Sequence, residues 1–189
     1  MDVLEAIRTR RTIAKFRPEP VPAETLTEIL ATGVWAPNHR LTEPWRFIIL
    51  GPETRRLLAE RFGELKAEKA PAEAAERRER VKAESTRMFL NLPAVVALAA
   101  LQEGDEQRRR EDYAAVCCAA QNVQLAAWAA GIGTKWSTSP LIHDPLAYRL
   151  LSLDPARFEI IGFLFAGYPA ESPTRERRLP LDEVIRTSP

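Results

Sequence analysis

Basic residues crowd into one short stretch near the N-terminus, residues 6–22, which reads AIRTRRTIAKFRPEPVP. Arg10, Arg11 and Thr12 stand together at the expected end of a helix, just before a proline-rich turn. Guanidinium groups can hold a phosphate through paired, charge-assisted hydrogen bonds, and a hydroxyl can add another. The stretch therefore predicts an anion site for a nucleic acid, a membrane headgroup or a small phosphorylated cofactor. A plain solvated basic surface is the alternative.

The charge balance of the whole chain favours the small ligand. The 189 residues include 27 Lys and Arg and 26 Asp and Glu, for a formal net charge of +1. Proteins that bind nucleic acids or membrane surfaces usually carry a basic excess over the whole domain. No apolar run reaches the roughly 18 residues that a membrane span needs, and no secretion signal is expected. We therefore expect a cytoplasmic protein without a nucleic-acid or membrane partner.

Two further stretches combine aromatic and hydrogen-bonding residues. In VWAPNHRLTEPWRF (34–47), Trp35 and His39 lie in a loop before an apolar run, and loops at strand ends commonly hold ligands. In GIGTKWSTSP (131–140), two glycines allow the backbone to approach a flat ring closely. Side chains that can donate hydrogen bonds or pack on a ring follow them: Lys135, Trp136, Ser137 and Thr138. Ordinary structural roles remain open for each stretch taken alone.

The sequence lacks the residue patterns of four other kinds of site: a dinucleotide fingerprint, a His and Cys metal site, a hydrolase triad and a redox cysteine pair. The Gly-x-Gly pair follows a helical stretch and has no third glycine, unlike a dinucleotide fingerprint. His39 and His143 are the only histidines, so no metal site of clustered His and Cys is expected. His143 and Asp144 lack the nucleophile elbow of a hydrolase. The adjacent Cys117 and Cys118 are interpreted as buried packing residues rather than as a redox pair.

Hydrophobic spacing and capping residues define the elements that must position these groups. Helical spacing predicts helices over residues 2–10, 22–33 with Gly33 as the cap, 113–131 as a central helix enclosed on all sides, and 144–153 with Asp144 as the N-cap. Short apolar runs predict buried strands over residues 45–50, 92–101 and 158–169. Strands separated by helices indicate an α/β or α+β domain.

The remaining segments are predicted to be connections or covers. Residues 103–112 form a charged loop and residues 131–140 a glycine-rich connection. The apolar face of the 53–90 stretch fades in its second half, so residues 65–90 are either a solvated helix or a mobile cover. The tail, residues 170–189, is a charged arm with an apolar end, which needs another surface such as a partner subunit to dock on.

Five motifs, in order and at family-like spacing, resemble the FMN-dependent nitroreductase family. They are RTRRTIAKFRPEPVP, WAPNHRLTEPWRF, GIGTKWSTSPL, IIGFLFAGYP and RERRLPLDEVI, and WAPNHRLTEPWRF is most similar to the small, minimal branch. The resemblance implies an α+β fold, a three-layer α/β/α arrangement with a central, mostly antiparallel sheet. It also implies that residues 1–189 form one domain, that two chains form an intertwined homodimer, and that one FMN lies in each of two clefts at the dimer interface.

The resemblance also implies which residues bind the cofactor. Arg10 and Thr12 match residues that bind FMN, with Arg11 between them, and Trp35 and His39 match loop positions that meet the flavin. The segment that lies against the cofactor is matched by Lys135, Trp136, Ser137 and Thr138. Arg175 and Arg177 match tail residues that reach the FMN phosphate, and Arg178 competes with them by one register. No catalytic side chain and no metal ligand is predicted.

Three positions depart from the family pattern. Ala14 stands where a basic residue is common two places after the hydroxyl, and Lys15 follows it. A cation near the pyrimidine end stabilises reduced flavin, so its absence would lower the reduction potential. Leu41 replaces a common Asn and Glu43 a common Gln in the loop after Trp35. These changes alter the usual flavin contacts of that loop and its substrate side.

The function expected from the resemblance is an NAD(P)H-dependent FMN oxidoreductase. Hydride would pass from NADH or NADPH to flavin N5 and then to nitroaromatic, quinone or similar acceptors, in a ping-pong scheme with one shared site. A flavin-fragmenting or dehalogenating enzyme of the same fold is an alternative. A non-catalytic module that stores FMN is another, and a nucleic-acid binder that uses the arginines of residues 8–17 and 108–110 is a third.

Overall fold

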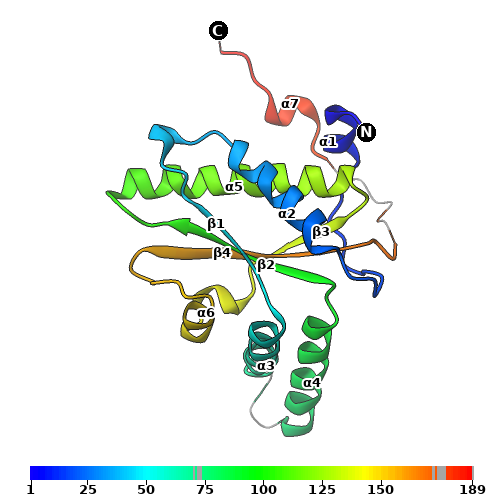
Figure 1. Cartoon of the computed structure of the whole chain (residues 1–189). Coiled ribbons are helices and arrows are strands. Elements are labelled where there is room, and N and C mark those ends of the chain that lie inside the picture. The colour runs from blue at the N-terminus through cyan, green and yellow to red at the C-terminus, as the bar shows by residue number, and fades with distance from the viewer. Residues whose placement is uncertain (70, 72–73, 172, 174–177, 189) are drawn as a thin grey trace.

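The computed structural model describes residues 1–69, 71, 74–171, 173 and 178–188. Its described strands form one antiparallel sheet in the order β1-β2-β4-β3 (Figure 1). The strands are β1 (Trp45–Ile49), β2 (Ala94–Leu101), β3 (Gly133–Ser137) and β4 (Phe158–Gly167). The three strands predicted from apolar runs are confirmed. The fourth, β3, occupies the segment predicted to be a glycine-rich connection.

Helices cover both faces of this sheet. The α-helices are α1 (Val3–Thr9), α2 (Ala23–Ala31), α3 (Pro52–Ala67), α4 (Ala75–Leu90), α5 (Glu106–Ala129), α6 (Pro145–Leu150) and α7 (Leu181–Val184). Short 3₁₀ turns are η1 (Thr32–Trp35), η2 (His39–Leu41) and η3 (Pro140–His143). In Figure 1, α2 and α5 lie on one side of the sheet, and α3, α4 and α6 lie on the other. The predicted α+β, three-layer fold with an antiparallel sheet is confirmed.

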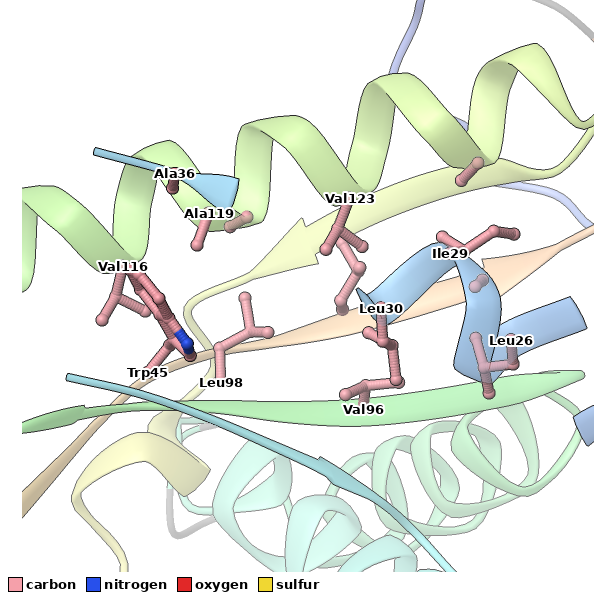
Figure 2. Close-up of a cluster of buried hydrophobic side chains, with 14 of the residues drawn as sticks. Leu26, Ile29, Leu30, Ala36, Trp45, Val96, Leu98, Val116, Ala119 and Val123 are labelled. Carbon is pink, nitrogen blue, oxygen red and sulfur yellow. The ribbon is translucent and has the colours of Figure 1, made fainter. Parts of the chain in front are cut away.

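Alternation along β2 explains the two cores. Successive side chains of a strand point to opposite faces, so Val96 and Leu98 join one apolar cluster while Val95 and Ala97 join the other. The first cluster packs under α2 and α5, as Figure 2 shows. Every residue of β2 is buried, because strands pair on both edges and helices cover both faces.

The edge of the sheet corrects one prediction. β1 pairs with β2 on one side only among the described strands, and the side chain of Ile49 is 45% exposed. The apolar run from residue 45 is therefore a half-buried edge strand rather than a buried one. Its composition does not reveal this, because a run of apolar residues is compatible with either position.

The stretch 103–112, predicted to be a charged loop, is mostly helical. Asp105 caps a helix by accepting a hydrogen bond from the amide of Arg108 at 2.9 Å, so α5 begins at Glu106. Charged residues are good helix formers on a solvated surface, and the N-cap at Asp105 marks the start that charge density concealed. The predicted C-terminal end is confirmed, since Gly131 has φ +77° directly after the helix.

The described chain does not enclose α5 on all sides. Tyr113 is 39% exposed and Cys118 is exposed on the face that points away from the sheet, whereas Cys117 is half-buried. The two cysteines are therefore not the buried packing residues that the sequence predicts. Their apolar surroundings in sequence suggested burial, but only one face of α5 packs on the sheet.

Gly33 is required by close packing and not by the helix cap that the sequence predicts. It does not cap α2, because the chain continues into η1. A Cβ at this position would lie 2.7 Å from the ring of Phe47, so only glycine allows the turn to pack against β1. Steric proximity, rather than a left-handed turn, explains the residue.

Candidate functional site

The N-terminal basic residues are held between two anchors. Helix α1 starts at its N-cap Asp2, which accepts a hydrogen bond from the amide of Glu5 at 2.9 Å, and ends where the amide of Arg10 donates to the Ala6 carbonyl. Beyond it, the amide of the fully buried Ile13 donates to the Thr134 carbonyl at 3.0 Å. The three residues between these anchors are Arg10, Arg11 and Thr12, so their backbone is fixed from both sides.

Both ends of the chain meet at this point. The amide of Arg17 donates to the Tyr168 carbonyl at 2.8 Å, and the amide of Ala170 donates to the Lys15 carbonyl at 3.0 Å. This pairing carries the chain after β4 alongside residues 15–17 and directs the C-terminal arm toward α1. In Figure 1, α7 and α1 lie on the same side of the sheet.

Three guanidinium groups gather there, and we name Arg10, Arg11 and Arg178 the arginine cluster. The pKa of Arg10 is lowered first by burial and then by the charges of Arg11 and Arg178. Arg11 itself donates to the carbonyl oxygens of Arg8 and Arg10, at 2.7 and 2.9 Å. Like charges in a partly buried place repel one another, so the cluster is suited to an anion.

Of the three candidate arginines in the tail, the structure describes one. Arg178, the competing candidate, lies in the field of Arg10. Arg175 and Arg177 lie outside the described residues. Lys15, which follows the departure at Ala14, forms an exposed ion pair with Glu171 at 2.9 Å.

Strand β3 runs next to the arginine cluster, because Thr12 forms a bridge with Thr134. The half-buried Lys135 and Ser137 alternate with Trp136, so they face the opposite side of the sheet. Exposed Thr138 follows the end of the strand.

The indole of Trp136 is engaged within the fold. Its Nε1 donates to the Ile161 carbonyl at 3.2 Å, and the ring lies so close over Gly162 that a Cβ there would overlap it. It packs against the core under α5. A contact between Trp136 and a ligand would therefore come from its backbone.

The loop of residues 35–43, which we name the aromatic loop, bonds to α5 near the other end of that helix, through His39 and Thr42. Trp35 is 85% exposed, and Nδ1 of His39 lies 2.8 Å from Oε2 of Glu111. The pKa of Glu111 is lowered, first by the hydrogen bond from Gln107 and then by the one with His39. Thr42 donates to the buried carboxylate of Asp112 at 2.5 Å.

A single chain keeps these two groups of residues apart. The loop is tied to Glu111, whereas the hydroxyl of Thr9, beside Arg10, accepts a hydrogen bond from Trp128 at 2.9 Å. Positions 111 and 128 of α5 are 17 residues apart and therefore about 25 Å apart at the helical rise of about 1.5 Å per residue. The structure brings Arg10, Arg11 and Thr12 to β3, with Arg178 near Arg10, and it leaves His39 far from them. Trp35 ends η1, whose Gly33 packs near Val123 of α5.

Comparison with known proteins agrees with this architecture. The nitroreductase family model matches residues 7–168, which include α2–α6 and all four described strands. The chain belongs to the nitroreductase family. The family predicted from the sequence is thus confirmed, and so is the corresponding enzyme class, an oxidoreductase.

Relatives and solved structures cover nearly the whole chain. YfhC of Bacillus subtilis, named as an NAD(P)H nitroreductase, is 35% identical over 179 residues, or 94% of this chain and 89% of its own. A nitroreductase-like protein from Bacillus cereus is 31% identical with a TM-score of 0.82, covering 100% of this chain and 96% of that one. A nitroreductase from Desulfovibrio desulfuricans in complex with FMN is 26% identical with a TM-score of 0.73, covering 100% and 98%.

Some site features of this family member were not predictable from the motifs. Glu111 and Asp112, which hold the aromatic loop, lie in the stretch predicted to be a charged loop. Helical numbering from the N-cap at Asp105 would have placed both on α5. Within the described parts of the chain, no group of three or more His, Cys, Asp or Glu could hold a metal ion. No described helix is long and apolar enough to cross a bilayer.

Proposed function

We propose that this nitroreductase-family protein is a homodimeric FMN oxidoreductase. It takes hydride from NADH or NADPH and delivers it to nitroaromatic, quinone or related acceptors by a ping-pong scheme. The observation that carries the proposal is the convergence of Arg10, Arg11 and Arg178 from opposite ends of the chain. The names of the relatives and the FMN-bound structure in the family support it. The cytoplasmic location stays a prediction.

The arginine cluster fits the phosphate of FMN. Both charges that lower the pKa of Arg10 belong to guanidinium groups, so a dianionic phosphate would relieve repulsion as well as add charge-assisted hydrogen bonds. Thr12 is exposed beside the cluster and supplies a hydroxyl. The backbone of β3, fixed by its pairing with β4 and by Ile13, offers a rigid edge for the rest of the cofactor.

A second copy of the chain would complete each site. His39 lies too far from the arginine cluster of its own chain to share one flavin with it, so we assign His39, and Trp35 from the same loop, to the site of the partner subunit. Exposed apolar side chains on α1 and the C-terminal arm support a dimer, because surfaces of this kind are commonly buried in subunit contacts. They include Val3 at 65%, Leu4 at 58%, Leu181 at 71% and Ile185 at 65% exposure.

Bound flavin would supply the acceptance and release of hydride. The residues of this chain would bind and orient it: the arginine cluster and Thr12 would hold the phosphate, and the backbone of residues 135–138 would contact the ring. Lys135 and Ser137 would donate hydrogen bonds to it from one face of β3. No side chain is assigned as an acid or base, because hydride transfer between two cofactors needs none.

Anaerobic reduction of the bound flavin distinguishes the enzyme from a flavin-storage module. Anaerobic addition of NADPH or NADH to the flavin-loaded protein should bleach the flavin band near 450 nm if hydride is transferred. A protein that binds FMN and keeps its oxidised spectrum would be a storage module. The flavin-fragmenting and dehalogenating alternatives predict acceptor-specific products, from oxygen and from a halogenated aromatic respectively, after the same bleaching.

Replacing Arg10 by Ala tests the phosphate site. We expect FMN binding to weaken by roughly 1.5–3 kcal/mol, the usual contribution of a hydrogen bond to a charged group, as measured by quenching of flavin fluorescence. Arg149→Ala is the matched control, since Arg149 is an exposed arginine of α6 on the other face of the sheet. Equal FMN affinity in the Arg10 variant and the control would remove the arginine cluster from the proposed site.

A further inference from the structure

The loop between residues 38 and 43 has a strained backbone. Arg40, Leu41 and Glu43 have φ values of +57°, +52° and +44°. Side chains with a Cβ rarely adopt this left-handed region, and Asn tolerates it better than Leu. Three such residues within four positions need external bonds to hold them, because strained conformations persist only where the surroundings fix them.

The side chains of the three residues with positive φ do not hold the loop in place themselves. All three are exposed, Leu41 to 83%. An exposed side chain makes few packing contacts, so the restraint must come from the residues between and around them. Those residues are Asn38, His39 and Thr42.

Side-chain hydrogen bonds supply the restraint. Oδ1 of Asn38 accepts from the amide of Glu43 at 3.0 Å and closes the loop on itself. The hydroxyl of Thr42 donates to Oδ1 of Asp112 at 2.5 Å, and Nδ1 of His39 meets Oε2 of Glu111 at 2.8 Å. Two adjacent carboxylates of α5 therefore hold the two sides of the left-handed pair Arg40–Leu41.

Asp112 differs from its neighbour in burial. Asp112 is 1% exposed, whereas Glu111 is partly open to solvent. The second oxygen of Asp112, Oδ2, is buried without a hydrogen-bond partner and lies 3.9 Å from Nε of Arg108. Burial strengthens the hydrogen bond that Asp112 accepts from Thr42, because the protein interior screens it less than bulk water does. Beside these bonds, a pocket of about 250 Å³ is lined by the loop, including Arg40 and Thr42, and by α5, including Arg108 and Asp112.

We propose that Asp112 is a positioning residue that, through Thr42, holds residues 39–43 in their left-handed form and thereby sets His39 where it meets the flavin of the partner subunit. The flavin contact of His39 rests on the proposed function, whereas the hydrogen bonds that hold the loop do not depend on it. Asp112 itself touches neither cofactor nor substrate. It acts through the backbone of the loop.

Thr42→Val is the test, because valine keeps the shape of threonine and removes the hydroxyl. The chain has two histidines, so the imidazole signal of His39 can be followed by NMR in the full-length protein with and without FMN. We expect the signal to move in Thr42→Val and FMN affinity to fall about 10-fold, as for a lost hydrogen bond that leaves a buried acceptor. Thr42→Ser, which retains the hydroxyl, should keep both values. Thr27→Val is the matched control, since Thr27 is an exposed threonine of α2 whose hydroxyl donates to Ala23.

A rescue separates positioning from general stabilisation. Glycine adopts a positive φ freely, so Leu41→Gly added to Thr42→Val should return the His39 signal and most of the FMN affinity. Leu41→Gly alone should leave the signal at its wild-type position, a result that does not depend on whether Thr42→Val folds. An unmoved His39 signal in Thr42→Val, a failed rescue, or a moved signal in Leu41→Gly alone would each overturn the proposal. Failure of the wild-type protein to take up FMN would instead overturn the proposed function.

Discussion

The two ends of α5 hold their site residues in different ways. At the C-terminal end, the end of α1 and backbone pairing with β3 fix Arg10, Arg11 and Thr12, and Arg11 adds side-chain hydrogen bonds to the carbonyls of Arg8 and Arg10. At the N-terminal end, side-chain bonds to Glu111 and Asp112 fix a loop whose backbone is strained. The arginine cluster therefore depends on the core of the fold, whereas the loop depends on a few polar contacts.

This difference has a consequence for stability. A site built on sheet pairing loses geometry only when the core loosens, and such changes are costly to the whole domain. A loop held by hydrogen bonds can change its conformation at little cost to the core. We therefore expect substitutions of the buried residues that anchor the first end to affect stability and FMN binding together, and those at the second end to affect binding with little loss of stability.

Ile13→Ala should produce the largest effect. Ile13 is fully buried and packs against Gly133 at the start of β3, directly after Thr12. Truncating a buried Ile typically costs about 2–5 kcal/mol through lost burial and a remaining cavity, and here it also loosens the anchor of the arginine cluster. Urea unfolding and FMN titration would measure both losses.

Ile49→Ala provides the control for that substitution. Ile49 is 45% exposed on the edge strand β1, so the same truncation should cost much less. If Ile13→Ala lost stability but retained wild-type FMN affinity, the arginine cluster would not depend on the core as the comparison requires.

Arg178→Ala should have a smaller effect, confined to binding. Arg178 comes from the C-terminal arm and contributes charge beside Arg10. Losing one charged hydrogen bond of roughly 1.5–3 kcal/mol corresponds to about 10- to 100-fold weaker FMN binding, while the melting temperature without FMN should stay within about 2 °C because the residue is exposed. A variant that bound FMN normally would place the phosphate away from the tail.

Much of the fold was accessible from sequence because its signals are local. The apolar runs of β2 and β4, and the N-cap and proline at Asp144 and Pro145, each predict an element without knowledge of the rest of the chain. β3 was missed because its glycine serves a contact with Ile13, which lies 120 residues earlier in sequence. A long-range contact of that kind leaves no local pattern.

The site shows the same division between local and long-range signals. The density of arginines at residues 10 and 11 predicts an anion site, but only the structure shows Arg178 beside them. The aromatic Trp136 was predicted to face the ligand, and the structure gives its indole a partner in β4. Facing direction depends on strand register, which the glycine-rich composition of the segment concealed. Whether the predicted residues bind FMN stays a prediction.

Glu111→Gln tests the contrast between the two ends of α5, because we expect it to cause a small, pH-dependent loss of stability at the end that holds the aromatic loop. Hydrogen bonds from Gln107 and with His39 lower the pKa of Glu111 in the folded protein below its ordinary value of 4.5. A carboxylate whose pKa is lower in the folded state stabilises that state at pH values above its unfolded pKa. This contribution is lost as the pH falls through the folded pKa, because protonation then no longer distinguishes the two states. Wild-type protein should therefore be slightly more stable than Glu111→Gln at pH 6–7, and the difference should vanish as the pH falls well below 4.5.

Thermal melts from pH 3 to 7 would measure this difference, with Glu60→Gln on α3 as the control because Glu60 pairs with Arg56 far from the loop. A stability difference that stayed constant from pH 3 to 7 would mean that Glu111 contributes through its shape alone. The pH-dependent part of the bond between the loop and α5 would then be absent, and the contrast between the two ends of α5 would depend on the hydrogen bond from Thr42 to Asp112.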